Sequence, residues 1–199
     1  MNSEPKITLK KTLGHLKTVL VHKFWVFHYA CKLGIFWRGL VHDNSKFSPV
    51  EFWESVRYWD GKRSPIPICK AYKGYSLAWQ HHKGRNSHHY EYWVDNLDQG
   101  GKAIKMPWKD MLELIADWLG AGKAYQGKDF TLLGEATWVE HKLEIECPKI
   151  HEQTRKALLY IFWAFATDRS HLDKFKVFEP CWKERYEQDK PLAEPNYDY

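Results

Sequence analysis

A helical hydrophobic pattern over residues 9–33 constrains the fold more than any other feature of this sequence. Apolar side chains recur there at steps of three and four residues, as they do on one face of an α-helix. They are Leu13, Leu16, Leu20, Phe24, Phe27 and Cys31. Lysines occupy the other faces, and Gly34 is expected to end the helix. The chain therefore begins with a long amphipathic helix.

Further helical patterns follow, and no segment shows a convincing two-residue period of a strand. Helices are expected around residues 42–43 and over 49–58, 107–124, 135–146 and 150–167, with two more helical stretches on either side of a turn within 75–93. Connections are expected over residues 60–74, 95–106 and 120–134, which contain Gly, Pro or polar residues. The sequence thus predicts an all-α, single-domain bundle of about six or seven helices. Its core spans about 9–167, and residues 168–199 form a charged C-terminal extension along the surface.

Composition and charge limit the classes of function. A chain of 199 residues is long enough for one domain with a real core. The net charge of +5 is spread along the chain, which suits an anionic substrate, whereas a nucleic-acid coat protein usually carries a clustered basic arm. No apolar run approaches the roughly 18 residues of a membrane span, and the N-terminus lacks a secretory signal. We therefore expect a cytoplasmic protein with reduced thiols and no membrane partner.

A possible metal site lies in residues 39–51, which read GLVHDNSKFSPVE. His42 and Asp43 are adjacent, and Lys46 follows within about one helical turn. Such a pair can hold a divalent first-row metal or bridge two metals, and Lys46 is long enough to reach an anion bound to them. The alternative is an ordinary helix start, with Asp43 or Ser45 as its cap.

Two nearby residues have simpler expected roles. Ser48 should cap the helix over residues 49–58, with Pro49 at its first position. Glu51 then fits a capping box closed by Ser48, and we favour that role over a catalytic one.

Four histidines stand within nine positions further along the chain. They are His81, His82, His88 and His89, with the run Gly84-Arg85-Asn86 interrupting the helical pattern between the pairs. Each buried imidazole needs partners for both ring nitrogens, so this density is hard to explain as core packing. We expect at least one pair to bind metal, and which pair does so stays open.

Asp117 lies inside the helix predicted over residues 107–124, between Ala116 and Trp118. A carboxylate in such apolar surroundings needs a partner to offset its desolvation, and a metal or a basic side chain is the usual one. Asp110 and Glu113 are nearer the first turn, where they are expected to favour the helix dipole and solvent.

Aromatic residues are unusually frequent, with 11 Trp, 11 Tyr and 10 Phe. Candidates for a wall on which a base could stack are Tyr75, Trp79, Tyr90 and Trp93. Packing in the core is the favoured role for these rings.

Taken in order, these motifs resemble the HD superfamily of metal-dependent phosphohydrolases. The run HDNSK resembles the His-Asp-x-Gly-Lys run of its HD-GYP branch, His81-His82 resembles the His-His-Glu of that branch, and IADWLGA resembles its Ala-Asp-x-x-Asp-Ala helix. Residues 13–165 also resemble a family of small, mostly phage and bacterial proteins of unassigned function, DUF5662, which implies no activity. A bacterial or phage-infected host cytosol follows as the expected location.

The HD resemblance implies one or two divalent metal ions (Mn, Fe, Zn, Co or Mg). Its implied metal ligands are His22, His42, Asp43, His81, His82 and Asp117, with His15, His88 and His89 as alternates. For the first ligand, His22 is preferred to His15. Its implied catalytic residues are Asp43, Lys46 and Arg85, and its implied substrate-binding residues are Lys46, Lys83, Arg85 and Asn86.

The function implied is hydrolysis of a nucleotide or related phosphate ester by metal-activated water. The sequence has Ser45 and Lys83 where the HD-GYP branch has Gly and Glu, and it lacks the Gly-Tyr-Pro, so cleavage of cyclic di-GMP is not implied. Two alternatives remain. The same ligands with two irons serve oxygenases, and a non-catalytic module could bind nucleic acid through its basic and aromatic surface. The expected partner is a small phosphate substrate, nucleic acid is a second option, and the oligomeric state stays open.

Overall fold

The computed structural model describes residues 4–147 and 149–194. Its α-helices are α1 (Leu9–Lys32), α2 (Phe36–Val41), α3 (Pro49–Tyr58), α4 (Pro65–Lys73), α5 (Leu77–Lys83), α6 (Trp108–Gln126), α7 (Leu132–His141), α8 (Glu152–Thr167), α9 (Ser170–Asp173) and α10 (Phe175–Glu187). Short helical turns are η1 (Asn44–Phe47), η2 (Tyr90–Trp93), η3 (Leu97–Gln99), η4 (Gly127–Asp129) and η5 (Lys142–Glu146). Strands β1 (Val94–Asp95) and β2 (Lys102–Ala103) form one antiparallel pair, with Val94 opposite Ala103. The predicted all-α, single-domain fold is confirmed.

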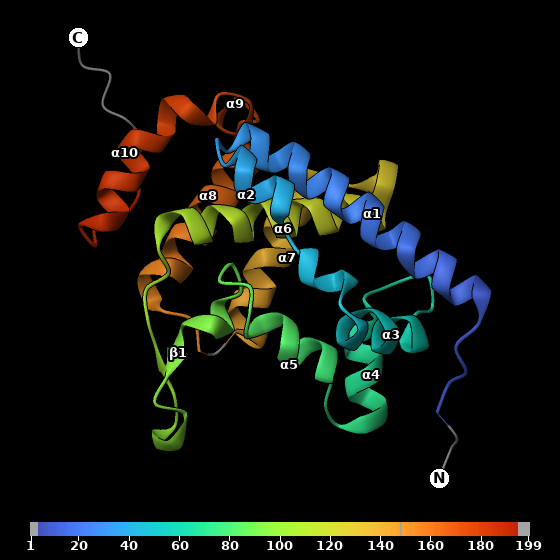
Figure 1. Ribbon diagram of the computed structural model, residues 1–199. Coiled ribbons are helices and arrows are strands. Elements are labelled where there is room, and N and C mark those ends of the chain that lie inside the picture. The colour runs from blue at the N-terminus through green and yellow to red at the C-terminus, as the bar shows by residue number, and fades with distance from the viewer. Residues whose placement is uncertain (1–3, 148, 195–199) are drawn as a thin grey trace.

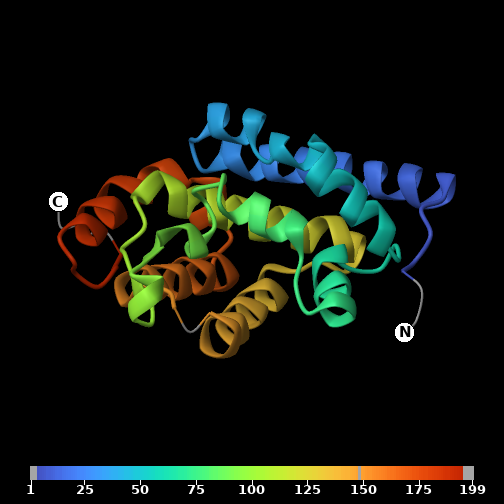
Figure 2. The ribbon, with the colours of Figure 1, turned by 60° about the horizontal axis from the view of Figure 1, so that its bottom comes forward.

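Helix α6 is the central element of the fold. It packs most extensively against α1, and α2 lies on α1 in the same layer (Figure 1). Turned to show its lower side, the molecule has α1 and α2 as one layer, α6 in the middle and α7 and α8 beyond it (Figure 2). Helix α3 packs against α4 and α5 and lies beside the N-terminal half of α1 (Figure 1). Helix α6 is therefore covered on both sides, which explains why residues 110–120 are all buried.

Helix α1 begins at Leu9 and ends at Lys32, close to the predicted bounds, but its buried face differs from the predicted one. Leu13, Leu20 and Phe24 are 58%, 53% and 62% exposed. The buried face consists of His15, Val19, His22, Val26, Tyr29 and Ala30. These residues also follow three- and four-residue steps, but two of them are histidines. Counting hydrophobic residues alone therefore selected the wrong face.

Two glycines let helices approach closely and bring the predicted ligands together. A Cβ atom on Gly120 of α6 would lie 2.8 Å from the backbone nitrogen of Val26 on α1. A Cβ atom on Gly39 of α2 would lie 2.4 Å from the Cβ atom of Ala30. Asp117 lies about one turn before Gly120, and His22 lies one turn before Val26, so this crossing places the two side chains side by side.

Two connections differ from the prediction. His42 and Asp43 lie between α2 and η1, not on a helix. Residues 60–74 contain α4, which Ser64 caps through a bond from the Ile66 N–H group, with Pro65 at its first position. A proline is compatible with a helix at that position because its missing N–H group has no partner in the first turn.

The core also extends past Thr167. Helices α9 and α10 bury Leu172, Phe175, Trp182 and Tyr186 in the same hydrophobic cluster as α6 and α8. This region differs from the expected surface extension because these four apolar side chains are spaced three to seven residues apart among the charges, which is enough for one buried helical stripe.

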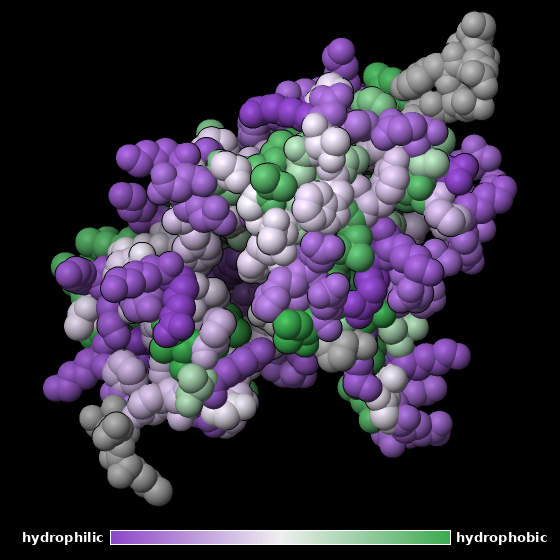
Figure 3. All heavy atoms as spheres, turned by 180° about the vertical axis from the view of Figure 1, so that it is seen from behind, coloured by the Kyte–Doolittle hydropathy of each residue, from purple (hydrophilic) through white to green (hydrophobic). Residues whose placement is uncertain are grey.

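Hydrophilic side chains dominate the face that is turned away in Figure 1, with small hydrophobic areas between them (Figure 3). Within residues 4–147 and 149–194, no helix combines the length and apolar character needed to cross a membrane.

Candidate metal centre

A tight turn aims His42 and Asp43 into the protein. His42 follows the last residue of α2 with φ −47° and ψ 131°. Asp43 comes next with φ 53° and ψ 28°, in the left-handed region that Asp tolerates better than most residues. Lys23 on α1 holds the turn, since its Nζ donates to the carbonyl of His42 and to Oδ1 of Asn44. As a result, both the imidazole and the carboxylate are buried, at 1% and 2% exposure.

One group of potential ligand atoms lies on the Oδ2 side of Asp43. His22 Nε2 lies 3.6 Å from this oxygen and 3.1 Å from Asp117 Oδ1. His42 Nε2 lies 3.2 Å from Asp43 Oδ2 and 3.3 Å from Asp117 Oδ1. The four residues thus present two nitrogens and two carboxylate oxygens within 4.8 Å of one another, a donor set that suits a divalent first-row metal.

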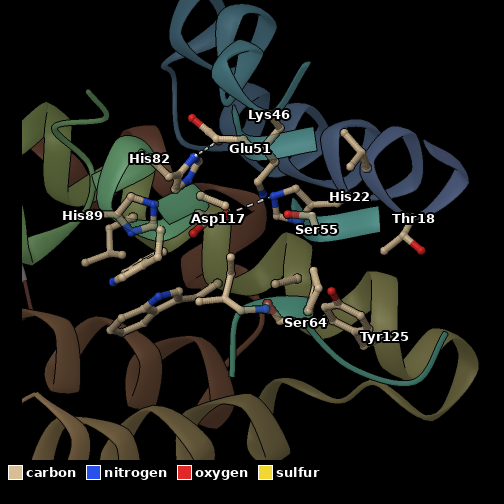
Figure 4. Close-up of a pocket in the computed structure, with 18 of the residues that line it drawn as sticks. Thr18, His22, Lys46, Glu51, Ser55, Ser64, His82, His89, Asp117 and Tyr125 are labelled. Atoms are coloured by element: carbon tan, nitrogen blue, oxygen red, sulfur yellow. Dashed lines mark hydrogen bonds and ion pairs between the residues drawn. The ribbon is translucent and has the colours of Figure 1, made fainter. Parts of the chain in front are cut away.

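A second group lies on the other side of the same carboxylate. Asp43 Oδ1 lies 3.3 Å from His82 Nε2 and 3.4 Å from His88 Nε2, and His89 completes the group. His82 comes from α5, whereas Asp117, from the other group, comes from α6; Figure 4 shows His82 and His89 together, with His22 on the other side of Asp117. Asp43 is therefore placed to bridge two ions, one per oxygen.

The bonding state of these atoms supports a ligand role. His22 Nε2, His88 Nε2, His89 Nε2 and Asp43 Oδ1 are buried, and none makes a hydrogen bond of good geometry within the described part of the chain. Leaving buried polar atoms unpaired costs about 1–3 kcal/mol each. One divalent cation in each group would satisfy them, the first through His22 Nε2 and the second through the other three atoms, so the residues present fit two such ions.

Two glutamates hold the histidines from behind. Glu113 Oε1 accepts from Nδ1 of His42 at 3.0 Å and lies 3.3 Å from Nδ1 of His88. Glu51 Oε2 accepts from Nδ1 of His82 at 2.7 Å. Each contact fixes the proton on Nδ1 and leaves Nε2 free to bind a metal, the usual arrangement behind metal-bound histidines.

The expectations for these acids need correction. Glu51 does not close a capping box: Ser48 caps α3, but the Ser48 N–H group donates to Ser45, and the Glu51 carboxylate contacts histidines. Glu113 does not face solvent, because Arg38 Nε donates to its Oε2 at 2.7 Å. Asp110 is also buried and pairs with the same Arg38.

Charge is balanced inside the centre. Burial opposes ionisation of Asp43, but the charges of His42 and Lys46 outweigh it and hold the pKa of Asp43 well below its ordinary value. Burial likewise opposes the charged form of His42, yet Asp43 and Asp117 hold its pKa well above the ordinary value. For His89, burial and the neighbouring histidines act together and lower the pKa well below normal, so this imidazole is neutral and ready to bind a cation.

The remaining predicted residues divide between the centre and its periphery. His81 lies outside the ligand groups: its Nδ1 lies 2.6 Å from Glu51 Oε1, and its Nε2 accepts from Arg85 Nε at 2.7 Å. His88 stands where His81 was expected, an alternate that the sequence had left open. Asn86 donates to the His82 carbonyl at 2.8 Å and to Ser45 Oγ at 3.0 Å, which ties the turn after α5 to η1.

A cavity of about 300 Å³ opens beside the ligand atoms and contains part of the predicted phosphate-binding set. Lys46 lines it, with Nζ 2.6 Å from Asp43 Oδ2. His15 also lines it but joins neither ligand group, and burial together with the charge of Lys46 lowers its pKa to about 4. Lys83 and Arg85 are not among the residues that line it.

The aromatic wall differs in part from the predicted one. Trp79 and Tyr90 line the cavity, whereas Tyr75 is exposed and Trp93 packs against the core. In their place the cavity has Trp118, Tyr125 and Trp138, which come from α6 and α7.

Glu135 should make the free energy of unfolding of this chain depend on pH. Its carboxyl group packs where a side chain on Gly122 would lie, and burial followed by the charge of Asp117 raises its pKa to about 8. The folded chain therefore keeps this proton up to about pH 8, while the unfolded chain releases it near pH 4.5, so the contribution to stability falls as pH rises through this window. Replacing Glu135 with glutamine should raise the free energy of unfolding at pH 8 by about 2–4 kcal/mol and change little at pH 4.

Urea unfolding of wild type and variant at both pH values measures this difference. Glu140→Gln, on the same helix but half-buried, is the matched control and should show no such pH-dependent gain. An equal effect of Glu135→Gln at pH 4 and pH 8 would contradict the assignment.

A family of proteins matches most of the chain. A family model described as a family of unknown function (DUF5662) matches residues 11–163, which confirms the closer of the two resemblances. No curated protein and no solved structure matches the chain. The resemblance to the HD superfamily stays a prediction that rests on the motifs and on the site.

Proposed function

We propose that this chain, which belongs to the family of unknown function DUF5662, is a metal-dependent hydrolase of phosphate esters related to the HD superfamily. The observation that carries the proposal is the position of Asp43 between two groups of ligand atoms, beside a cavity that Lys46 also lines. The order of the ligands along the chain, from His22 through His42 and Asp43 to Asp117, supports the relation to HD proteins.

Two divalent ions held by these groups would lower the pKa of a coordinated water and polarise a phosphoryl oxygen. His22, His42 and Asp117 would hold one ion, His82, His88 and His89 the other, and Asp43 both. Glu113 and Glu51 keep the imidazoles of their partners in the binding tautomer.

Lys46 supplies positive charge on the substrate side. Its Nζ already lies 2.6 Å from Asp43 Oδ2, so a phosphoryl group in the cavity would meet an ammonium group next to the ligands. In the overall reaction, water forms a bond to phosphorus, the bond to the leaving oxygen breaks, and that oxygen takes a proton. The products are an alcohol and phosphate.

A screen of phosphate esters against Mn²⁺, Mg²⁺, Zn²⁺, Co²⁺ and Fe²⁺ tests the proposal. Wild type should release phosphate with at least one metal, and Asp117→Ala should lower kcat/KM by more than about a hundredfold, because the variant loses a ligand that contacts both His22 and His42. Asp129→Ala, an exposed acid outside the centre, is the control. Release of phosphate by no ester with any metal, or full activity of Asp117→Ala, would contradict the proposal.

A di-iron oxygenase is the second candidate, favoured by the excess of nitrogen donors in the group of His82, His88 and His89. Metal analysis and an optical spectrum after aerobic purification distinguish the two. A coloured, iron-containing protein that consumes oxygen and releases no phosphate would favour the oxygenase.

A further inference from the structure

An uncharged apolar stripe runs along the outer side of α1. Its members follow at steps of four, three and four residues, and this series occurs twice. Eleven residues in three turns is close to the natural period of an α-helix, so the stripe stays on one side of α1 for about 33 Å. It consists of Leu9, Leu13, Leu16, Leu20, Phe24, Phe27 and Cys31. The side that a helix of this composition normally buries is thus turned away from the core, which α1 contacts through its other side.

Helix α2 widens this apolar surface. Four of its six residues are apolar and exposed, namely Phe36, Trp37, Leu40 and Val41. The rings of Phe27 on α1 and Phe36 on α2 have centres 5.1 Å apart, so the two helices form one continuous surface. Figure 2 shows both helices at the outer edge of the molecule, with α6 on their inner side. We call the α1 stripe together with these four residues of α2 the α1–α2 face.

The area of the α1–α2 face is what one copy contributes to a stable dimer. Eight of its residues are between 45% and 74% exposed, namely Leu9, Leu13, Leu20, Phe24, Phe36, Trp37, Leu40 and Val41. With roughly 150–250 Å² for one large side chain, the eight together expose roughly 700–1,200 Å². The largest apolar patch of a typical monomer is roughly 300–600 Å², whereas a standard interface buries about 800 Å² on each partner. The face is therefore larger than a monomer usually leaves in water.

The order of side chains along the α1 stripe suits pairing with its own copy in the antiparallel direction. Leu20 is at the midpoint, with equal lengths of stripe to Leu9 and to Cys31. The half before Leu20 contains only leucines, and the half after it contains both phenylalanines, Phe24 and Phe27. A twofold axis at Leu20 places the leucine half of each copy on the phenylalanine half of the other. Large side chains then face smaller ones, which lets the two rows interdigitate.

The charges near the face distinguish a second copy from an anionic partner. Residues 5–42 contain seven basic side chains and no acidic one. Four of the seven are held by contacts within the chain: Lys11 with the Arg57 carbonyl, Lys23 with the His42 carbonyl, Lys32 with Asp173, and Arg38 with Asp110 and Glu113. Lys10 and Lys17 are exposed on α1. Two copies therefore repel each other weakly, and salt screens this repulsion, whereas salt would weaken binding to an acidic protein or an anionic membrane.

We propose that the α1–α2 face is the interface of a homodimer, in which the α1 helices of two copies pack antiparallel about a twofold axis near Leu20. The interface lies on the opposite side of α1 from the metal centre, because Leu20 and His22 are about 200° apart around the helix. The dimer thus covers the outer side of the helices that carry His22 and lead to His42, and it leaves the cavity open.

Analytical ultracentrifugation of three chains tests the proposal. Wild type should sediment as a dimer that higher salt strengthens. Leu20→Lys should raise the Kd of the dimer more than about a hundredfold, because the twofold axis brings two like charges together in an apolar interface. The matched control is Leu133→Lys, which changes an exposed leucine of α7 outside the face and should remain a dimer. All three chains should keep the same circular dichroism spectrum and the same metal content.

Cross-linking with bis-maleimidoethane tests the direction of the helices. The parent chain is Cys31→Ser, which removes an exposed thiol from the face. Leu20→Cys in this parent should give a covalent dimer. Leu13→Cys should not, because antiparallel pairing separates its two copies by about 21 Å along the helix axis, whereas parallel pairing would bring them together.

Three results would each overturn the inference. They are a wild-type monomer at the highest soluble concentration, a dimer that Leu20→Lys leaves intact, and cross-linking of Leu13→Cys as efficient as that of Leu20→Cys. A wild-type monomer that sediments with vesicles of anionic lipid would also overturn it and would assign the α1–α2 face to a membrane surface. None of these results depends on hydrolysis of a phosphate ester.

Discussion

Replacing Asp43 with asparagine is expected to abolish the stabilisation of this chain by divalent metal ions. The two oxygens of Asp43 face different ligand groups, and both groups depend on it. Asparagine keeps the size and tolerates the left-handed backbone of this position, but its NH₂ group cannot bind a cation. Wild type should gain about 2.7 kcal/mol for each ion that it binds at a metal concentration a hundred times the Kd, and the variant should gain almost nothing.

Thermal unfolding with Mn²⁺, Zn²⁺ and Fe²⁺, each compared with a chelated sample, measures this effect. The metal-free variant is itself expected to be less stable, because His42 and Lys46 would lose their buried counter-charge. The comparison must therefore be the metal-dependent gain for each chain, not its absolute stability. Asp129→Asn is the matched control, as an exposed acid outside both groups. A gain in Asp43→Asn equal to that of wild type would contradict the bridging role.

The second large effect is the difference expected between two substitutions, His88→Ala and His81→Ala, in bound metal and in activity. His88 Nε2 lies 3.4 Å from Asp43 Oδ1, whereas His81 contacts Glu51 and Arg85 and reaches neither group. Changes behind a metal ligand cost about 10- to 100-fold in metal affinity, and loss of the ligand itself should cost more. His88→Ala should therefore lower the metal content from two ions per chain to one and reduce phosphate release more than a hundredfold, whereas His81→Ala should retain both ions.

Elemental analysis after dialysis counts the ions, and the screen of phosphate esters measures the activity. The two substitutions are chemically identical and lie seven residues apart, so each serves as the control for the other. Two ions in His88→Ala together with a single ion in His81→Ala would reverse the assignment and restore the ligand pair inferred from the HD resemblance.

The helices follow from local periodicity, but their orientation does not. The bounds of α1 and α6 agree with the predictions to within a few residues, because each has a long pattern of three- and four-residue steps. The buried face of α1 was missed, since His15 and His22 interrupt its apolar stripe. A helix that supplies ligands to a buried centre must turn some polar residues inward. Its buried face therefore cannot be found by the rule that apolar residues mark the buried side of a helix.

In the metal centre, too, some residues could be predicted from the sequence and others could not. His22, His42, Asp43 and Asp117 were predicted from residue type and order, and they come together in one group. Glu113 was missed, although it lies four residues before Asp117 and so on the same face of α6. That spacing could have identified it, but its position in the first two turns favoured a role at the helix end. The choice of His88 over His81 depends on the turn after α5, which no short-range pattern specifies.

The most direct measurement is anomalous diffraction from crystals of the Mn²⁺-loaded chain. The site described above predicts two peaks, one next to Asp43 Oδ2 among His22, His42 and Asp117, the other next to Asp43 Oδ1 among His82, His88 and His89. Two ions bridged by one carboxylate should lie about 3.5–4 Å apart. The absence of any peak within bonding distance of Asp43 at saturating Mn²⁺ would contradict the account.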